Sequence, residues 1–170
     1  NADLTGASGI KDLAGNSLAN FVFSTNNNSV YVVNTAPRLT SSAIQNLTVL
    51  EDSSATSLGL GGVSYSPGTD YEASQQLTYT VKGLPGTLGD IGNNDASGNF
   101  VAISVGDVLS LPQLQTLQFR AAPNQTGSAQ FSFDVTDSGT DASGAGALTL
   151  AQSLTINVLG VNDAPVVDPN

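Results

Sequence analysis

The sequence predicts an all-β protein: a seven-stranded antiparallel sandwich of Greek-key type, preceded by a short β-hairpin fragment. Short runs of alternating apolar and polar residues indicate strands that are buried on one face. Turn residues separate these runs, and the chain has 18 Gly and 7 Pro in 170 residues. Gly, Ser, Thr, Asn and Val are abundant, which is typical of β-sandwiches.

Seven strands are expected in the main part of the chain. They cover residues 43–50, 56–65, 76–82, 100–105, 116–122, 128–136 and 148–159. The breaks between them fall at Pro67-Gly68, Gly83–Gly86, Gly106-Asp107, Pro123-Asn124 and Ser138-Gly139.

Three of these strands have a clear apolar face. Leu154, Ile156 and Val158 alternate with polar residues in the last strand. The sixth and third strands show the same period of two, so their apolar residues should also lie in the core: Ala129, Phe131, Phe133, Val135, Leu77, Tyr79 and Val81. We expect the aromatic residues among them to pack in the core and not to bind a ligand.

The two ends of the predicted sandwich carry similar linkers. Residues 32–37 read Val-Val-Asn-Thr-Ala-Pro, and residues 161–165 read Val-Asn-Asp-Ala-Pro, with a spacing of 128 residues from Asn34 to Asn162. This spacing predicts one module over residues 34–167. Residues 1–33 are too short to bury a core of their own and are expected to be the last strands of a preceding module.

Composition limits the classes of partner. Fourteen Asp and Glu face four Lys and Arg, the net charge is −10, and there is no His. Nucleic acids and anionic membranes bind basic surfaces, so this charge argues against both and favours cations. No apolar run approaches the ~20 residues of a membrane span, so direct membrane insertion is not expected.

Catalysis is not expected either. Without His or Cys, the common pairings of a nucleophile with a base cannot form. A carboxylate pair such as Glu51 with Asp163 could in principle hydrolyse glycosides, but no sequence signal of a substrate groove accompanies it.

Strand direction predicts where the acidic residues gather. If successive strands alternate in direction, Asn34, Asp70, Glu72 and Asp137 meet at one end, called here the near end. Glu51, Asn162 and Asp163 meet at the opposite, far end, with Asp52 beside them. Calcium takes six to eight oxygen ligands from carboxylates, amides and carbonyls, whereas zinc and copper prefer His or Cys. Both clusters are therefore candidate Ca²⁺ sites.

Simpler explanations stay open for each acid, because Asp and Asn also favour turns and solvated loops. Residues 90–95 (Asp-Ile-Gly-Asn-Asn-Asp) have a spacing loosely similar to a calcium loop, and a Gly/Asn hairpin explains them equally well. Asp141 is a further candidate ligand at the near end.

Several motifs resemble a known family. Residues 161–165 are similar to the linker of cadherin-type domains. Residues 77–85, 124–127 and 131–139 resemble the cadherin-like tandem repeats of large RTX-type surface adhesins of bacteria. The Asp-Leu-Ala-Gly-Asn turn at residues 12–16 resembles the closing hairpin of bacterial immunoglobulin-like domains. The resemblance implies a cadherin- or immunoglobulin-like fold, secretion to the cell surface and calcium between adjacent modules of one polypeptide.

The resemblance also assigns residues. Glu51 matches the early glutamate of the family, and Asp70 and Glu72 stand at its Asp-x-Asp pair. Asp137 matches the Ala-x-Asp position, and Asn162 and Asp163 match the linker pair. Departures are Gly160 and Thr35 in place of linker Asp residues, and a missing Leu-Asp-Arg-Glu motif. These departures imply one or two ions at each junction instead of a full set.

Two functions follow as expectations. The first is a monomeric structural repeat, stiffened by calcium, that extends an extracellular adhesin and so supports adhesion. The second is an adhesin module that binds a glycan or a peptide. Tyr65 and Tyr71 are the only aromatic candidates for such a site, and both are expected to pack locally.

Overall fold

The computed structural model describes residues 34–139 and 146–162, without the side chain of Tyr71. The chain divides into two units, Asn1–Val32 and Val33–Asn170, and every described residue belongs to the second. The hairpin fragment predicted over residues 1–33 lies outside the described residues.

Strands dominate the described residues, and the helices among them are short. The elements are β1 (Arg38–Leu39), β2 (Leu47–Leu50), β3 (Thr56–Ser57), β4 (Tyr65–Ser66), the 3₁₀ turn η2 (Asp70–Glu72), β5 (Leu77–Gly83), the 3₁₀ turn η3 (Gly86–Leu88), β6 (Gly89–Asn94), β7 (Phe100–Ala102), β8 (Val108–Leu109), α1 (Leu111–Gln115), β9 (Gln118–Ala121), β10 (Gly127–Asp137) and β11 (Thr149–Leu159). In residues 34–139 and 146–162, no helix has the length and apolar character needed to cross a membrane.

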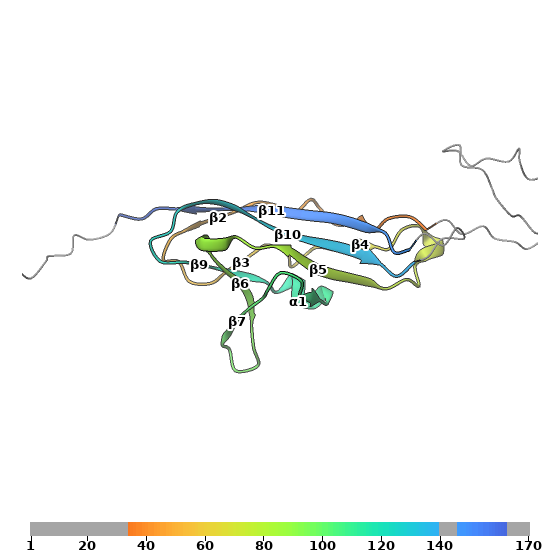
Figure 1. Cartoon of the computed structure of the whole chain (residues 1–170), viewed down its shortest axis with the longest axis horizontal. Coiled ribbons are helices and arrows are strands. Elements are labelled where there is room, and N and C mark those ends of the chain that lie inside the picture. The colour runs from red at the N-terminus through yellow and green to blue at the C-terminus, as the bar shows by residue number, and fades with distance from the viewer. Residues whose placement is uncertain (1–33, 140–145, 163–170) are drawn as a thin grey trace, which may run out of the picture. The chain divides into compact units, whose positions relative to one another are not determined.

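The largest sheet has five strands in the order β2-β11-β10-β5-β8. Strands β10 and β11 form its centre, and they pair antiparallel from Gly127 opposite Val158 to Thr136 opposite Thr149. Each has eleven residues, so each spans roughly 35 Å. They run along the length of the unit (Figure 1), which sets the distance between its two ends.

A second sheet has four strands in the order β3-β9-β6-β7, and β1 pairs with β4 in a separate two-stranded sheet. One hydrophobic core joins the two larger sheets. It combines Phe131 and Ile156 of the five-stranded sheet with Phe119 and Ile91 of the four-stranded sheet. The arrangement is that of an all-β protein with sheets packed around a shared core.

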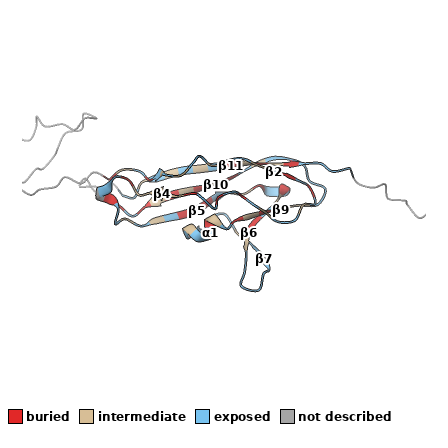
Figure 2. Ribbon diagram, turned by 180° about the vertical axis from the view of Figure 1, so that it is seen from behind, coloured by how far each residue is buried: buried red, intermediate tan, exposed pale blue. Residues whose placement is uncertain are grey.

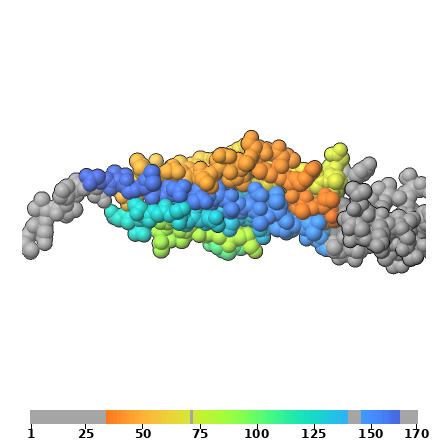
Figure 3. All heavy atoms as spheres, turned by 90° about the horizontal axis from the view of Figure 1, so that it is seen from above, coloured from red at the N-terminus to blue at the C-terminus, as the bar shows by residue number. Residues whose placement is uncertain are grey.

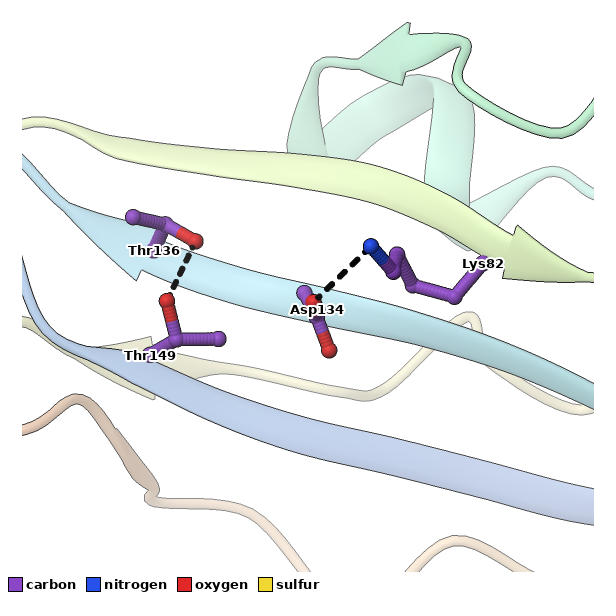
Figure 4. A network of polar contacts seen from close by, with 4 residues as sticks. All are labelled: Lys82, Asp134, Thr136 and Thr149. Carbon is purple, nitrogen blue, oxygen red and sulfur yellow. Dashed lines mark hydrogen bonds and ion pairs between the residues drawn. The ribbon is translucent and has the colours of Figure 1, made fainter.

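The alternation predicted for the central strands is confirmed. Phe131, Phe133 and Val135 of β10 are at most 1 % exposed, and the residues between them are only partly buried. In Figure 2, buried stretches are drawn in red along β10 and its neighbouring strands. The opposite face of β10 is polar: Asp134 pairs with Lys82 at 3.7 Å, and the Thr136 hydroxyl lies 2.9 Å from that of Thr149 (Figure 4).

The all-β class is confirmed, but the seven-stranded Greek-key detail is not. The predicted strand over residues 56–65 is wrong: β3 and β4 are separate, because the chain turns at Gly61-Gly62 and Gly59 has a φ of +75°. Strand β2 is shorter than predicted and runs parallel to β11. Strand β6 was not predicted, and neither was α1, although Ser110 and Gln113 form a capping box at its start.

Truncating Phe131 to alanine should destabilise the fold by about 3–5 kcal/mol, because its ring is fully buried and a cavity would remain. Gln130→Ala is the matched control, since Gln130 is exposed on the other face of the same strand; it should change stability by no more than about 0.5 kcal/mol. Urea denaturation measures both. Similar losses for the two variants would contradict the assigned face of β10.

Candidate functional site

The buried polar or charged side chains of the described residues lie at the two ends of the apolar core. They are Asn34, Glu51, Glu72 and Asp137. Asp137 continues the inward-facing positions of β10, and Glu51 continues those of β2 after Val49, so the strand period itself turns both carboxylates inward. All four are among the seven residues that sequence reasoning selected.

At the near end, hydrogen bonds hold Glu72 against the first described residues. Its Oε1 accepts the Thr35 amide N–H at 2.5 Å. Its Oε2 accepts the Thr35 hydroxyl at 2.6 Å, the Thr69 amide N–H at 2.6 Å and the Thr69 hydroxyl at 2.8 Å. Gly68 allows this close approach, because a Cβ at this position would overlap Glu72 Oε2 and Thr35 Oγ1. Glu72 therefore fastens residue 35 to the η2 turn.

The protonation of Glu72 reflects these contacts. Burial raises the pKa of a carboxyl group, but the hydrogen bonds from Thr35 and Thr69 outweigh this effect and lower the pKa of Glu72 to about 2. The carboxylate therefore stays ionised over most of the pH range although it is only 1 % exposed.

Asp137 forms a second near-end cluster. Its Oδ1 accepts the amide N–H groups of Gly139 and Leu148, both at 3.0 Å, and the Asn34 Nδ2 at 3.3 Å. Asn34 Oδ1 in turn accepts Gln75 Nε2 at 3.0 Å. Within the described part of the chain, Asp137 Oδ2 and Gln75 Oε1 are buried without a hydrogen-bond partner.

Gly139 lies in the middle of this second cluster. A Cβ at residue 139 would overlap both Asn34 Oδ1 and Gln75 Nε2, so the two amides pack directly on the glycine Cα. The cluster of Asn34, Gln75 and Asp137 around Gly139 is called the amide–carboxylate cluster below. The cluster joins the start of the module to the first residue of β5 and the last residue of β10. These two residues, Leu77 and Asp137, are paired in the sheet.

Asp70 lies at the same end but outside these contacts. It begins the η2 turn that Glu72 ends, and its side chain is exposed. Among the described residues, no hydrogen bond to its carboxylate is found. The structure thus brings Asn34 and Asp137 together, places Glu72 on Thr35, and leaves Asp70 facing solvent.

At the far end, Glu51 holds the segment that follows β11. Its Oε1 accepts the Val161 amide N–H at 2.8 Å, and its own amide N–H donates to the Leu159 carbonyl at 2.8 Å. Asn162 is exposed. Asp163 and Asp141 lie outside the described residues, so their predicted roles as ligands stay predictions.

The other sequence candidates have local explanations. Strands β6 and β7 form a hairpin, and Asp95 accepts the amide N–H groups of Ser97 and Asn99 at 2.8 and 2.9 Å within its turn. The hydrogen bonds from Asn99 lower the pKa of Asp95. The hairpin alternative for residues 90–95 is confirmed.

Tyr65 packs locally, as expected. Its ring centre lies 5.7 Å from that of Tyr79, and its hydroxyl is buried. Burial, with a smaller contribution from Tyr79, raises the pKa of Tyr65 to about 12. A half-buried ring whose hydroxyl is enclosed offers little platform for a sugar.

Sequence reasoning missed Thr35, Thr69 and Gln75. Thr69 to Glu72 has the Thr-x-x-Glu spacing of a capping box, which could have indicated their contact. Gln75 carries no such signal, because its partner Asn34 is 41 residues away.

Among residues 34–139 and 146–162, no group of three or more acidic side chains is arranged to hold a metal ion. No protein-family model, curated protein or solved structure matches the chain.

Acid should weaken the fold through Glu72. The pKa of Glu72 is lower in the folded chain, about 2, than its ordinary value of 4.5. Its contribution to stability is therefore complete above pH 4.5 and is lost as the pH falls toward 2. Urea denaturation between pH 6 and pH 2 (about four pH units) should show a steeper loss for the wild type than for Glu72→Gln. Equal slopes would show that the Thr35 and Thr69 contacts do not depend on the charge.

Proposed function

We propose that this chain is a calcium-stiffened structural repeat of a secreted bacterial surface adhesin, and that it supports adhesion by holding other parts of the adhesin away from the cell. The observation that carries the proposal is the buried Asp137 carboxylate at the near end. One of its oxygens has no hydrogen-bond partner in the described part of the chain. A buried carboxylate oxygen without a partner is costly, and a bound cation would remove the cost.

The chemistry of the near end suits calcium. Asp137 contributes a carboxylate, and Gln75 contributes a buried amide oxygen that has no partner in the described residues. Asn34 links the two side chains, because its Nδ2 donates to Asp137 and its Oδ1 accepts from Gln75. Calcium binds carboxylate, amide and carbonyl oxygens in flexible geometry, so an irregular group of this kind can hold it. The chain has no Cys or His for a softer metal.

The path of the chain is consistent with a repeat in a linear array. The first described residues lie at one end of the unit, and the residues after β11 lie at the other (Figure 3). Glu72 fastens the first segment and Glu51 fastens the last. Neighbouring modules of one polypeptide would then follow each other end to end, and they are the partners that we propose.

The proposal includes the relationship to cadherin-like repeats. In it, residues 34–167 form one module whose main strands follow the seven-stranded Greek-key plan, and residues 1–33 belong to the module before it. The motifs at residues 131–139 and 161–165 support this reading. Location at the cell surface is part of the same proposal.

Calcium should raise the thermal stability of the chain. A ligand at about 100 times its Kd stabilises a fold by about 2.7 kcal/mol, which shifts Tm by several degrees. We expect this shift when wild-type protein in calcium at about 100 times the Kd is compared with protein in chelator. Asp137→Asn should lose the shift, because it removes the negative charge that would hold the cation.

Asp134→Asn provides the matched control. It removes the same charge from the same strand, but Asp134 lies on the outer face and pairs with Lys82. This variant should keep the calcium response. A wild-type Tm that calcium leaves unchanged, with no metal bound on direct titration, would refute the proposed function.

A further inference from the structure

The two buried carboxylates at the near end have different surroundings. Glu72 accepts four hydrogen bonds from Thr35 and Thr69, whereas Asp137 has one oxygen without a partner in the described residues. Building on the proposed function, we infer that Glu72 is a clamp that needs no metal, and that the near-end cation is bound by Asp137 together with Gln75, with Asn34 holding both side chains in place.

Glu72 is a poor candidate for a ligand because its oxygens are already used. Oε2 accepts three hydrogen bonds of 2.6 to 2.8 Å, and Oε1 accepts the Thr35 amide N–H at 2.5 Å. A cation on Oε2 would displace the hydrogen bonds from the Thr35 hydroxyl and from the Thr69 amide and hydroxyl, which lie in a partly buried setting. This clamp differs from the ligand role that the family resemblance implies for residue 72.

Gln75 has the properties of a ligand that the sequence did not reveal. Its Nε2 is fixed by the bond to Asn34 Oδ1, and its Oε1 is buried without a partner in the described residues. Asn34 is fixed in turn on Asp137 Oδ1. The amide–carboxylate cluster therefore contains two buried oxygens without a partner in the described residues, one from Gln75 and one from Asp137.

The charge of the amide–carboxylate cluster predicts its affinity for calcium. Asp137 supplies the only negative charge of the amide–carboxylate cluster, and Gln75 and Asn34 are neutral. Calcium sites weaken as the number of charged ligands falls, and extracellular modules bind with a Kd of about 10⁻⁴–10⁻³ M. We place the near-end site in this range, so it would fill only where calcium is abundant.

Two substitutions separate the clamp from the cation site. Gln75→Leu removes the amide at similar size and should raise the calcium Kd about tenfold or more, whereas Glu72→Gln should leave it within about threefold. In chelator, Glu72→Gln should lower Tm more than Gln75→Leu does. The reason is that four charge-assisted hydrogen bonds weaken when Glu72 loses its charge. Isothermal titration calorimetry and thermal melting give the two readouts.

A third substitution tests whether an added negative charge strengthens calcium binding. Gln75→Glu keeps an oxygen at the same place and adds a second carboxylate next to Asp137. It should bind calcium more tightly than wild type, by about tenfold or more, and should melt lower in chelator because two like charges then face each other without a cation. Gln76→Leu is the matched control: Gln76 is exposed, only its backbone N–H is bonded in the described residues, and both readouts should stay unchanged.

The outcomes distinguish this inference from the proposed function. If wild-type protein binds calcium, but Glu72→Gln abolishes binding and Gln75→Leu does not change it, the assignment of roles is wrong and the proposed function stands. If wild-type protein binds no calcium, both the ligand assignment and the proposed function fail. Weaker binding in Gln75→Leu with unchanged binding in Glu72→Gln supports the inference.

Discussion

A buried carboxylate must find hydrogen-bond donors or a cation, and this constraint governs both ends of the sandwich. The apolar core is closed at the near end by Glu72 and Asp137 and at the far end by Glu51. Glu72 and Glu51 satisfy the constraint with donors from segments outside the central strands, namely residues 35 and 161. The demand of each acid for a partner thereby fastens the segments that lead into and out of the core.

Asp137 meets the same constraint only in part. Its Oδ1 accepts three hydrogen bonds, and its Oδ2 accepts none from the described residues. Native proteins seldom leave a buried charged oxygen in this state without a role for it. The neighbouring amides of Asn34 and Gln75 extend the polar group without adding charge, which suits a cation that is bound weakly and reversibly.

The central strands are long, so they connect the contacts at one end of the module with those at the other. Strands β10 and β11 are fully paired between their ends, so the near and far carboxylates are separated by a stiff ladder. The ladder is stabilised by its buried face, which includes Phe131, Phe133 and Ile156. In the repeat that we propose, such a ladder would transmit orientation from one end to the other.

Much of the site was predictable because strand periodicity acts over short distances. The period of two in residues 129–137 determines that Asp137 faces inward, and the same argument applies to Val49 and Glu51. The direction of successive strands then places acids from distant parts of the chain at the same end. The four buried polar residues were found in this way.

The contacts of these acids were less accessible to sequence reasoning. Thr35 contacts Glu72 across 37 residues, and Gln75 contacts Asn34 across 41. The parallel pairing of β2 with β11 and the division of residues 56–65 into two strands also depend on packing between distant segments. No local pattern of apolar and polar residues encodes such pairings.

The sequence by itself determined the all-β class, the apolar faces of the long strands and the end of the module at which each buried acid lies, because these follow from a period of two and from turns. Only the tertiary structure decided which donors each carboxylate receives. Glu72 acquires four, whereas one oxygen of Asp137 receives none from the described residues, since that outcome depends on how loops from distant parts of the chain meet at the near end.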